Sequence, residues 1–267
     1  MKLIKQSFEI LEQKDFTLKG IKQFIERCGR VCYKSEDRIT DTSYEKFVNM
    51  LENRDHSRPL EFGTVHLKMP YGIFNYIARL CISRGFWNSY WIKYNIDFNP
   101  HKDFSNKDVY ITTNYRYYKA LRTLNSLCHI DVENFLDESD GSLYPKRHTV
   151  HMILSRGVMD EFRTHVGLSH LAESTRYCNY SKDKFDNQVT FIIPNWLDIK
   201  PQEKLSIRDI YTGKDFDEES PKYILLNALL CAEISYKTLL TKGCTPQQAR
   251  EVLPLSVKSE LISCGFE

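Results

Sequence analysis

The chain has 267 residues, of which 42% are hydrophobic and 27% charged, so it contains enough apolar material to bury a full core. Its 37 Lys and Arg residues nearly balance its 35 Asp and Glu residues, and this balance excludes an overall field that would attract nucleic acid or a membrane. Any anion-binding site must therefore be local.

The cysteines and the first residues of the chain indicate in which cellular compartment the protein is expected. The 8 cysteines include no C-x-x-C pair, and a chain of this length does not need disulfides for stability, so they are typical of reduced thiols. The first residues lack the apolar core of a signal peptide, and no stretch approaches about 18 uninterrupted apolar residues. We expect a cytoplasmic protein with one domain over residues 1–267 and without membrane or nucleic-acid partners.

Two amphipathic helices are expected near the N-terminus. Residues 18–33 place apolar side chains at helical spacing along one stripe. A second such pattern starts at Thr42, a hydroxyl cap, and has Glu45 at the third helical position. Both patterns indicate helices that pack one face on a core.

Strand and helix patterns then alternate along the chain. Strand patterns occupy residues 64–69, 108–113, 148–154 and 188–194. A long helix is predicted from about Pro221 to Leu240, and a shorter one follows Thr245 as cap, Pro246 at the first position and Gln248 in a capping box. This order predicts an α/β (α+β) class with a mixed sheet flanked by helices. Residues 80–107 and 130–147 are interpreted as surface insertions.

Several common chemical signatures are missing from the chain. It has no G-x-G-x-x-G motif after a strand, no G-x-x-x-x-G-K-[ST], no H-E-x-x-H and no G-x-S-x-G. Cys28 and Cys32 have the spacing of two metal ligands on a helix, but buried helical cysteines are far more common. We therefore predict no metal site.

Three polar clusters remain as candidate sites. In the first, His56, Arg58 and Glu61 precede the strand at 64–69, where groups are often presented to a ligand. A capped loop would give the same pattern. In the third, Arg250 lies among apolar residues of a short helix, and such an arginine more often extends to solvent or pairs with a carboxylate.

The second cluster is residues 161–181, "EFRTHVGLSHLAESTRYCNYS". Arg163 and Arg176 can hold a phosphate or a pyrimidine edge through their planar guanidinium groups, and Ser174 adds a short donor and acceptor. The alternative is a solvated helix face with internal salt bridges.

Taken together and in order, these segments resemble the flavin-dependent thymidylate synthases. "RVCYKSEDRIT" (30–40) and "HSRPLEFGTVHL" (56–67) are similar to the helix-to-loop and H-x-x-P-L-E-H segments of that family, and "AREVLP" (249–254) is similar to its A-R-x-x-L-P. "DVYITTNYR" (108–116) and "FIIPNW" (191–196) are similar to segments of a bacterial and phage branch. The family signature R-H-R-x-x-S-x-N-E-x-S-x-R-Y aligns without a gap when it is counted back from Arg176.

The resemblance implies the fold of that family and a reaction in which dUMP becomes dTMP. It implies FAD as cofactor, NADPH and methylene-tetrahydrofolate as co-substrates, and a homotetramer whose active sites are shared between subunits. The dUMP-binding residues implied are Ser174, Arg176 and Arg250. The residues implied at the flavin and folate are His56, Arg58, Arg163, His165 and Glu173. No residue is assigned a catalytic role.

The chain departs from the family pattern at several positions. Thr164 and Val166 replace the two arginines that flank the signature histidine, and Phe62 replaces the histidine after Glu61. The family continues after "AREVLP" with a late L-R arginine that has no counterpart here, so we expect a truncated chain with exposed apolar surface near Leu261. Two alternatives therefore stay open: a non-catalytic nucleotide-binding relative with a structural or interaction role, and a pyrimidine-nucleotide hydroxymethylase.

Overall fold

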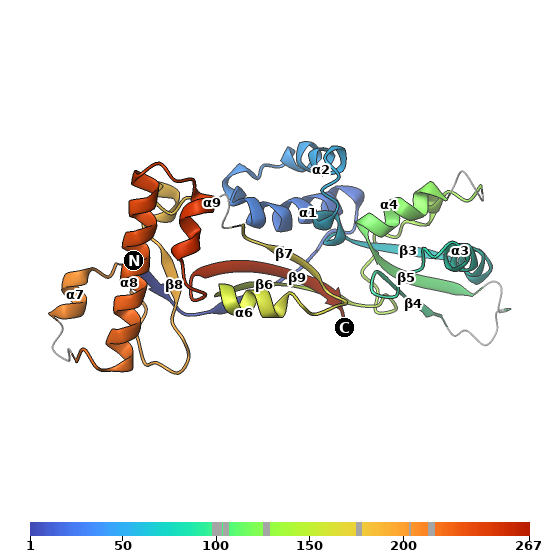
Figure 1. Cartoon of the computed structure of the whole chain (residues 1–267). Coiled ribbons are helices and arrows are strands. Elements are labelled where there is room, and N and C mark those ends of the chain that lie inside the picture. The colour runs from blue at the N-terminus through green and yellow to red at the C-terminus, as the bar shows by residue number, and fades with distance from the viewer. Residues whose placement is uncertain (98–102, 104–106, 125–128, 175–177, 203, 213–216) are drawn as a thin grey trace.

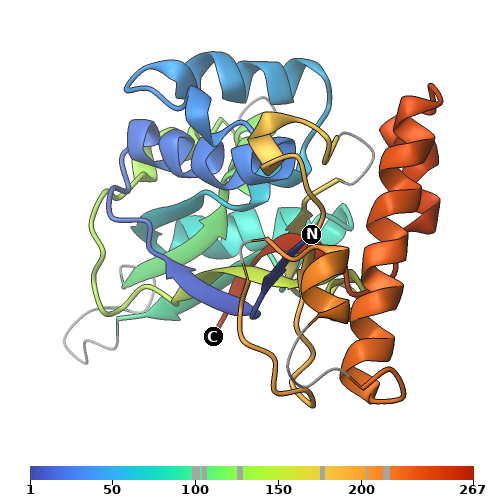
Figure 2. The same cartoon turned by 90° about the vertical axis from the view of Figure 1, so that its left-hand side faces the viewer.

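A computed structural model describes residues 1–97, 103, 107–124, 129–174, 178–202, 204–212 and 217–267. Three sheets follow one another along an elongated molecule, with the C-terminal helices at one end and α3 and α4 at the other (Figure 1). In the view turned by 90°, α1 and α2 form a layer above the strands, and α8 stands beside them (Figure 2). The predicted α/β class, with helices packed on sheets, is confirmed.

The helices and strands occur along the chain in the order that the sequence patterns predict. The α-helices are α1 (Leu18–Tyr33), α2 (Ser43–Asn53), α3 (Tyr71–Ser83), α4 (Tyr115–Thr123), α6 (Arg156–Phe162), α7 (Ile207–Tyr211), α8 (Pro221–Thr241) and α9 (Pro246–Ala249). The strands are β1 (Lys2–Ile4), β2 (Ser7–Leu11), β3 (Thr64–Pro70), β4 (Ile92–Ile96), β5 (Asp108–Asn114), β6 (Arg147–Ser155), β7 (Ser169–Ala172), β8 (Thr190–Ile192) and β9 (Lys258–Phe266). Each helix and strand predicted from the sequence is present, with small shifts at the ends.

The central sheet has four antiparallel strands in the order β2-β6-β9-β7. Because side chains alternate across a strand, β9 presents one set to α1 above it and the other to α6 below it (Figure 1). Ile262 packs with α1, and Leu261 packs with Met159 of α6. Both side chains are fully buried, so the expectation of exposed apolar surface near Leu261 is wrong. The segment is the inner strand of a sheet, with β6 and β7 along its edges and α1 and α6 on its two faces.

The second sheet is antiparallel with the order β3-β5-β4, and α3 and α4 pack on it. β4 comes from the 80–107 segment, which therefore contributes a paired strand as well as surface. The 130–147 segment also packs on this sheet, because Leu136 bridges to Leu67 and Tyr144 stacks on His66 at 4.1 Å.

The third sheet pairs β1 with β8 in parallel and carries α8 against it. The Met1 ammonium lies 2.8 Å from the Glu233 carboxylate of α8, which ties the first strand to this helix. By length and composition alone α8 is apolar enough to cross a membrane, a test that core helices of soluble proteins also pass. Here one face of α8 packs on the core with Leu226, Leu229 and Leu230.

The helix caps show where local sequence signals hold. The capping box of α9 is formed by Thr245 and Gln248 as predicted. However, α9 ends at Ala249 and a 3-10 turn, Arg250–Val252, follows, because Pro254 lies too close for the helix to continue. α2 begins as predicted, but the Thr42 side chain makes no capping hydrogen bond.

Candidate functional site

Residues 161–174 and 178–181, the described part of this cluster, do not form the solvated helix that was the alternative interpretation. α6 ends at Phe162, a turn containing Gly167 follows, and β7 then pairs with β9. Gly167 has a φ of +99°, a conformation that favours glycine, and its Cα lies against the Tyr90 ring. Ser174 lies two residues beyond the end of β7 and lines a pocket. Arg176 lies outside the described residues.

One pocket, which we call the arginine pocket, lies where α6, the end of β7 and the turn after α9 meet. Its volume is about 260 Å³. It is lined by Arg156, Met159, Arg163, Ala172, Glu173, Ser174 and Arg250. Three guanidinium groups and one hydroxyl thus face one cavity, a donor set that binds a phosphate or a pyrimidine carbonyl by charge-assisted hydrogen bonds.

The acidic neighbours of these arginines lie toward solvent. Arg156 Nε is 3.4 Å and Arg163 Nη1 is 3.6 Å from the carboxylate of Asp160, which is 45% exposed. Arg250 Nε is 3.6 Å from the carboxylate of the exposed Glu251. Exposed ion pairs of this kind contribute little to stability.

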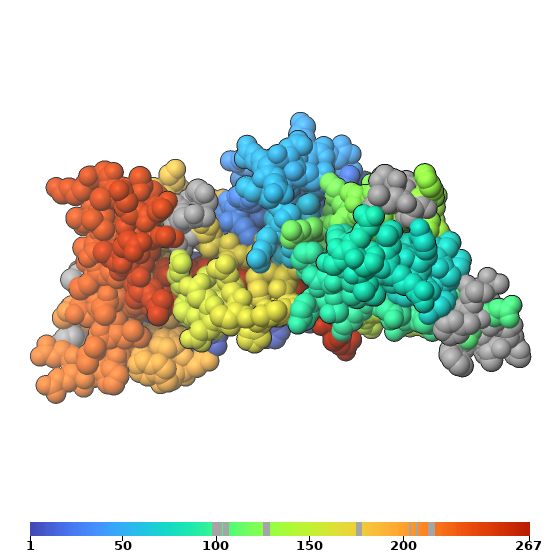
Figure 3. Space-filling view, turned by 45° about the vertical axis from the view of Figure 1, so that its right-hand side comes forward, coloured from blue at the N-terminus to red at the C-terminus, as the bar shows by residue number. Residues whose placement is uncertain are grey.

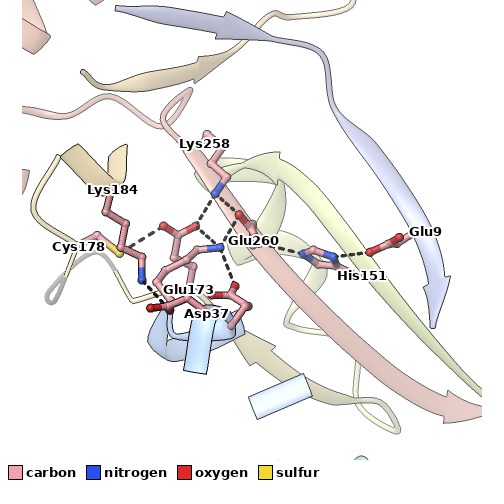
Figure 4. Close-up of polar contacts among 10 residues, drawn as sticks. Glu9, Asp37, His151, Glu173, Cys178, Lys184, Lys258 and Glu260 are labelled. Carbon is pink, nitrogen blue, oxygen red and sulfur yellow. Dashed lines mark hydrogen bonds and ion pairs between the residues drawn. The ribbon is translucent and has the colours of Figure 1, made fainter. Parts of the chain in front are cut away.

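Glu173 forms the buried inner wall of the arginine pocket. Its Oε2 accepts a hydrogen bond from Lys258 Nζ at 3.0 Å and its Oε1 accepts one from Cys178 Sγ at 3.3 Å (Figure 4). Lys34 Nζ lies 4.0 Å from the same carboxylate. Both oxygens are thus held from inside the protein, and the role of Glu173 at a cofactor stays a prediction.

The charged network continues along β6 and β9. Glu260 binds Lys258 and Lys34, and it accepts a hydrogen bond from His151 Nε2 at 3.0 Å (Figure 4). Burial would raise the pKa of Glu260, but the hydrogen bond from His151 and the charges of both lysines hold it well below its usual range. The same hydrogen bond raises the pKa of His151. The floor of the site is therefore a network of ionised groups that compensate one another.

Arg163 also lines a second cavity of about 330 Å³, which we call the histidine pocket. Its other lining residues are Arg58, Glu61, Tyr90, Trp91, Arg116, Thr164, His165, Val166, Gly167, Leu168 and His170. In Figure 3 the turn after α6 forms the surface between the C-terminal helices and the α3 side, beneath α1 and α2. The structure therefore brings three of the predicted cofactor residues together, namely Arg58, Arg163 and His165.

Glu61 holds the histidine pocket together. Its Oε1 accepts a hydrogen bond from Arg116 Nη1 and its Oε2 accepts one from Ser169 Oγ, both at 2.6 Å. The Arg116 guanidinium also lies over the Trp91 ring, 5.0 Å from its centroid. Because Arg116 is committed to these contacts, Arg58 and Arg163 are the cations that this pocket offers to a ligand.

The two histidines of the pocket differ in setting. His170 is buried, with Nδ1 2.8 Å from Ser263 Oγ and Nε2 3.2 Å from the carbonyl oxygen of His165. Burial lowers the pKa of His170, so the ring is neutral near pH 7 and donates from Nε2 to that carbonyl. The His165 ring stacks on Phe162 at 5.1 Å. His170 thereby positions the backbone of His165, whose ring lines the cavity.

His56 lies apart from both pockets. It is exposed, and its Nδ1 is 3.1 Å from the Tyr33 hydroxyl, at the end of α2. The 3-10 helix Arg58–Glu61 begins two residues later and turns Arg58 toward the histidine pocket instead. His56 and Arg58 therefore face different parts of the surface within the chain, and the role of His56 at flavin or folate stays a prediction.

Sequence reasoning did not single out several residues of the two pockets. Arg156, Arg116 and His170 are spread over more than fifty positions, and Trp91 belongs to a segment interpreted as a surface insertion. A weak signal was available for Arg116, because it lies three residues after the predicted strand 108–113. Within the described part of the chain, no group of three metal-binding side chains is present and the cysteines form no disulfide.

Comparison with known proteins gives one family match. A family model described as thymidylate synthase complementing protein matches residues 146–265. No curated protein sequence matches the chain.

Two solved structures of a UMP/dUMP methylase, PolB from Streptomyces cacaoi, are similar to the chain. The form bound with 5-Br UMP is 13% identical, with a TM-score of 0.37 over 99% of this chain and 74% of that one. The form bound with 5-Br dUMP is 13% identical, with a TM-score of 0.36 over 100% of this chain and 75% of that one. Likenesses this distant carry no argument about function.

Proposed function

Because a family model described as thymidylate synthase complementing protein matches residues 146–265, we propose that this protein binds dUMP and methylates it reductively to dTMP. The observation that carries the proposal is the arginine pocket. All seven of its lining residues fall within the matched segment. They combine three arginines with Ser174, as an anionic pyrimidine nucleotide requires.

In this proposal the arginine pocket binds and orients dUMP. Arg250 and Arg156 hold the phosphate, and Ser174 and Arg163 contact the sugar or the pyrimidine edge. Glu173, fixed by Lys258 and Cys178, keeps the wall of the pocket rigid. Precise orientation of the reacting ring is the contribution that a protein makes when cofactors supply the chemistry.

The histidine pocket presents cationic and ring side chains of the kind that can bind a flavin dinucleotide. Arg58 and Arg163 are available for the phosphates of FAD, and His165 offers a ring beside them. When bound, reduced FAD would supply the hydride, methylene-tetrahydrofolate the one-carbon unit and NADPH the reducing equivalents. Because Arg163 lines both pockets, it is the residue through which the two ligands would meet.

The assembly and the location of the protein belong to the proposal too. We infer a cytoplasmic homotetramer with shared sites, which the family resemblance implies. A shared site would also explain why His56 stands exposed at the end of α2, because a neighbouring subunit could bring a ligand to it.

One observation favours a non-catalytic nucleotide-binding relative as the second candidate. Thr164 and Val166 line the histidine pocket at positions where the family signature has arginines. Each missing charge-assisted contact weakens binding by about 1.5 to 3 kcal/mol, so flavin affinity is where this chain would first lose activity. The arginine pocket is unaffected by these changes.

The decisive experiment titrates purified protein with dUMP by calorimetry. Arg250→Ala should weaken dUMP binding by at least about tenfold, the effect of losing one charge-assisted contact. Arg79→Ala is the matched control, since Arg79 is exposed on α3, remote from the arginine pocket (Figure 1). Equal affinity in all three proteins, or no binding of dUMP, would contradict the proposed nucleotide site.

A second measurement separates the enzyme from the non-catalytic relative. Oxidised-flavin absorbance in the purified protein, perturbed by dUMP, together with conversion of dUMP to dTMP when NADPH and methylene-tetrahydrofolate are added, supports the enzyme. Tight binding of dUMP by a protein that takes up no FAD supports the relative that only binds nucleotide. Release of 5-hydroxymethyl product in place of dTMP supports the hydroxymethylase.

A further inference from the structure

One aromatic side chain of the histidine pocket, Tyr90, is largely uncovered. It lines the cavity and is 55% exposed. Within the described part of the chain its ring stacks on no other ring and its hydroxyl has no hydrogen-bond partner. An aromatic ring buries a large area when a flat partner covers it, so an uncovered ring at a cavity is a surface for a ligand.

The backbone that carries Tyr90 is fixed in place. The Tyr90 N–H donates to Asn88 Oδ1 at 2.9 Å, and the Trp91 N–H donates to the Asn88 carbonyl oxygen at 3.0 Å. The Trp91 carbonyl in turn accepts a hydrogen bond from Thr113 Oγ1 of β5 at 2.9 Å, and β4 begins at the next residue. The ring is therefore held on a sheet, and a ligand that covers it does not first have to order a loop.

Gly167 allows the Tyr90 ring to lie close to the turn that carries His165. A Cβ atom at position 167 would lie 3.0 Å from Tyr90 Cδ1 and 3.1 Å from Cε1, tighter than an ordinary van der Waals contact. Glycine thus leaves a cradle for the ring, and its φ of +99° is a conformation that favours glycine. The ring is fixed beside the turn, while more than half of its surface stays accessible.

The charged groups around Tyr90 indicate the kind of ring that would cover it. Arg58 and Arg163 line the same cavity, whereas Thr164 and Val166 give it no charge. The cavity of about 330 Å³ is at the small end of ligand sites, so it can enclose one ring system of a dinucleotide. Two cations beside an open aromatic ring suit a planar group that gains negative charge on reduction, and the isoalloxazine ring of a flavin is such a group.

We propose that Tyr90 is a positioning residue that stacks on the isoalloxazine ring of FAD, an inference that rests on the proposed flavin site. Ring contact with Tyr90 would supply affinity at a turn that lacks the two arginines of the family signature. The 80–107 segment, interpreted from the sequence as a surface insertion, would then contribute directly to the cofactor site through Tyr90.

Calorimetric titration of the whole protein with FAD tests the ring contact. Tyr90→Ala should weaken FAD binding by about tenfold, whereas Tyr90→Phe should stay within about twofold of wild type because it keeps the ring. Tyr76→Ala is the matched control, since Tyr76 is 50% exposed on α3 and does not line the cavity. Equal FAD affinity in Tyr90→Ala and wild type would overturn the inference.

Flavin fluorescence reports stacking separately from affinity. A phenol ring in contact with an excited isoalloxazine quenches its fluorescence by transient electron transfer, and a phenyl ring does not. FMN is the probe because it has no adenine to quench the flavin internally. At saturation, FMN bound to Tyr90→Phe should be several-fold brighter than FMN bound to wild type. Equal brightness in the two proteins would show that Tyr90 does not touch the flavin ring and would overturn its role.

The same titrations separate this inference from the proposed function. If wild-type protein binds neither FAD nor FMN, both the proposed flavin site and the role of Tyr90 are overturned. If Tyr90→Ala weakens FAD but not FMN, the ring covers adenine and the isoalloxazine assignment is wrong. Affinity for dUMP should be equal in Tyr90→Ala and wild type, because Tyr90 does not line the arginine pocket. An equal loss of dUMP and FAD affinity would show that Tyr90 supports the fold and would overturn its stacking role.

Discussion

The arginine pocket and the histidine pocket share Arg163 but are built in different ways. The arginine pocket takes all its residues from 146–265, and its wall is fixed by the buried ions Glu173, Lys258 and Glu260. The histidine pocket draws on four separate parts of the chain. Its internal contacts are centred on one carboxylate, Glu61.

The difference teaches how each pocket can lose its ligand. The arginine pocket depends on a network of opposite charges, so removing one member leaves the others buried and uncompensated. The histidine pocket depends on which side chains the turn at 164–166 presents, because its framework through Glu61 does not involve that turn. Substitution of two turn residues can therefore weaken the second pocket without disturbing the first.

The largest expected effect comes from breaking the network beneath the arginine pocket. Lys258→Met leaves Glu173 and Glu260 with Lys34 as their nearby lysine, and we expect a loss of about 3 kcal/mol in the free energy of unfolding. Lys68→Met is the control, because Lys68 is 42% exposed and its pair with Asp108 is long at 3.8 Å. Urea unfolding followed by circular dichroism measures both. A loss below about 1 kcal/mol for Lys258→Met would show that the network is not stabilising.

The shared residue gives a sharper comparison. Arg163→Ala should weaken both dUMP and FAD by roughly tenfold, about 1.4 kcal/mol each, because its guanidinium lines both cavities. Arg250→Ala should weaken dUMP alone, since Arg250 does not line the histidine pocket. Titration of each variant with each ligand makes the test. An Arg163→Ala variant that loses only one ligand would show that the pockets function independently of this residue.

Substitutions that restore the family arginines should strengthen FAD binding in the histidine pocket. Thr164→Arg combined with Val166→Arg places two cations in this cavity and should raise FAD affinity by about tenfold, with dUMP affinity unchanged. Val158→Arg is the control, because Val158 is 45% exposed on α6 and lines neither pocket. Flavin fluorescence quenching measures the affinity. No gain over the control would mean that the turn does not face the flavin.

The smallest expected effect is on pH dependence. Hydrogen bonding to Glu260 raises the pKa of His151, so the folded state favours the protonated ring. His151 should thus contribute about 1 kcal/mol of stability at pH values below its ordinary pKa of 6.5, and this should be lost as the pH rises through the raised pKa. Thermal unfolding of His151→Gln at pH 5.5 and at pH 8.5 measures it.

The exposed histidine of the same strand provides the matched control for this test. His148 is 51% exposed on β6, so His148→Gln removes an imidazole from the same strand without removing a buried hydrogen bond. A destabilisation by His151→Gln that is equal at pH 5.5 and pH 8.5 would show that the ring acts by packing alone.

Local patterns in the sequence predicted most of the elements. α1, α2 and α8 follow from apolar periodicity, and the capping box of α9 follows from Thr245 and Gln248. Ser174 and Arg250 were singled out because they occupy positions of the family motifs, and Arg163 because it precedes the signature segment; the structure places all three in one pocket. These features depend on neighbours close in the chain, which a sequence displays directly.

The remaining features depend on residues that are distant in the chain. Leu261 and Ile262 were expected near an exposed end, yet they are buried because β9 inserts between β6 and β7. Glu61 accepts hydrogen bonds from Arg116 and Ser169, which lie 55 and 108 residues from it in the chain. No periodicity or local motif encodes such a pairing.

By itself the sequence determined the α/β class, most element positions, the absence of a strong overall charge and the match of residues 146–265 to one family model. The tertiary structure alone decided that Arg163 lines two pockets, that His56 lines neither, and that Tyr90 lies against the turn at Gly167. The reason is physical. Secondary structure is chosen by nearby residues, whereas a binding site forms where strand pairing and helix packing bring distant side chains to one place.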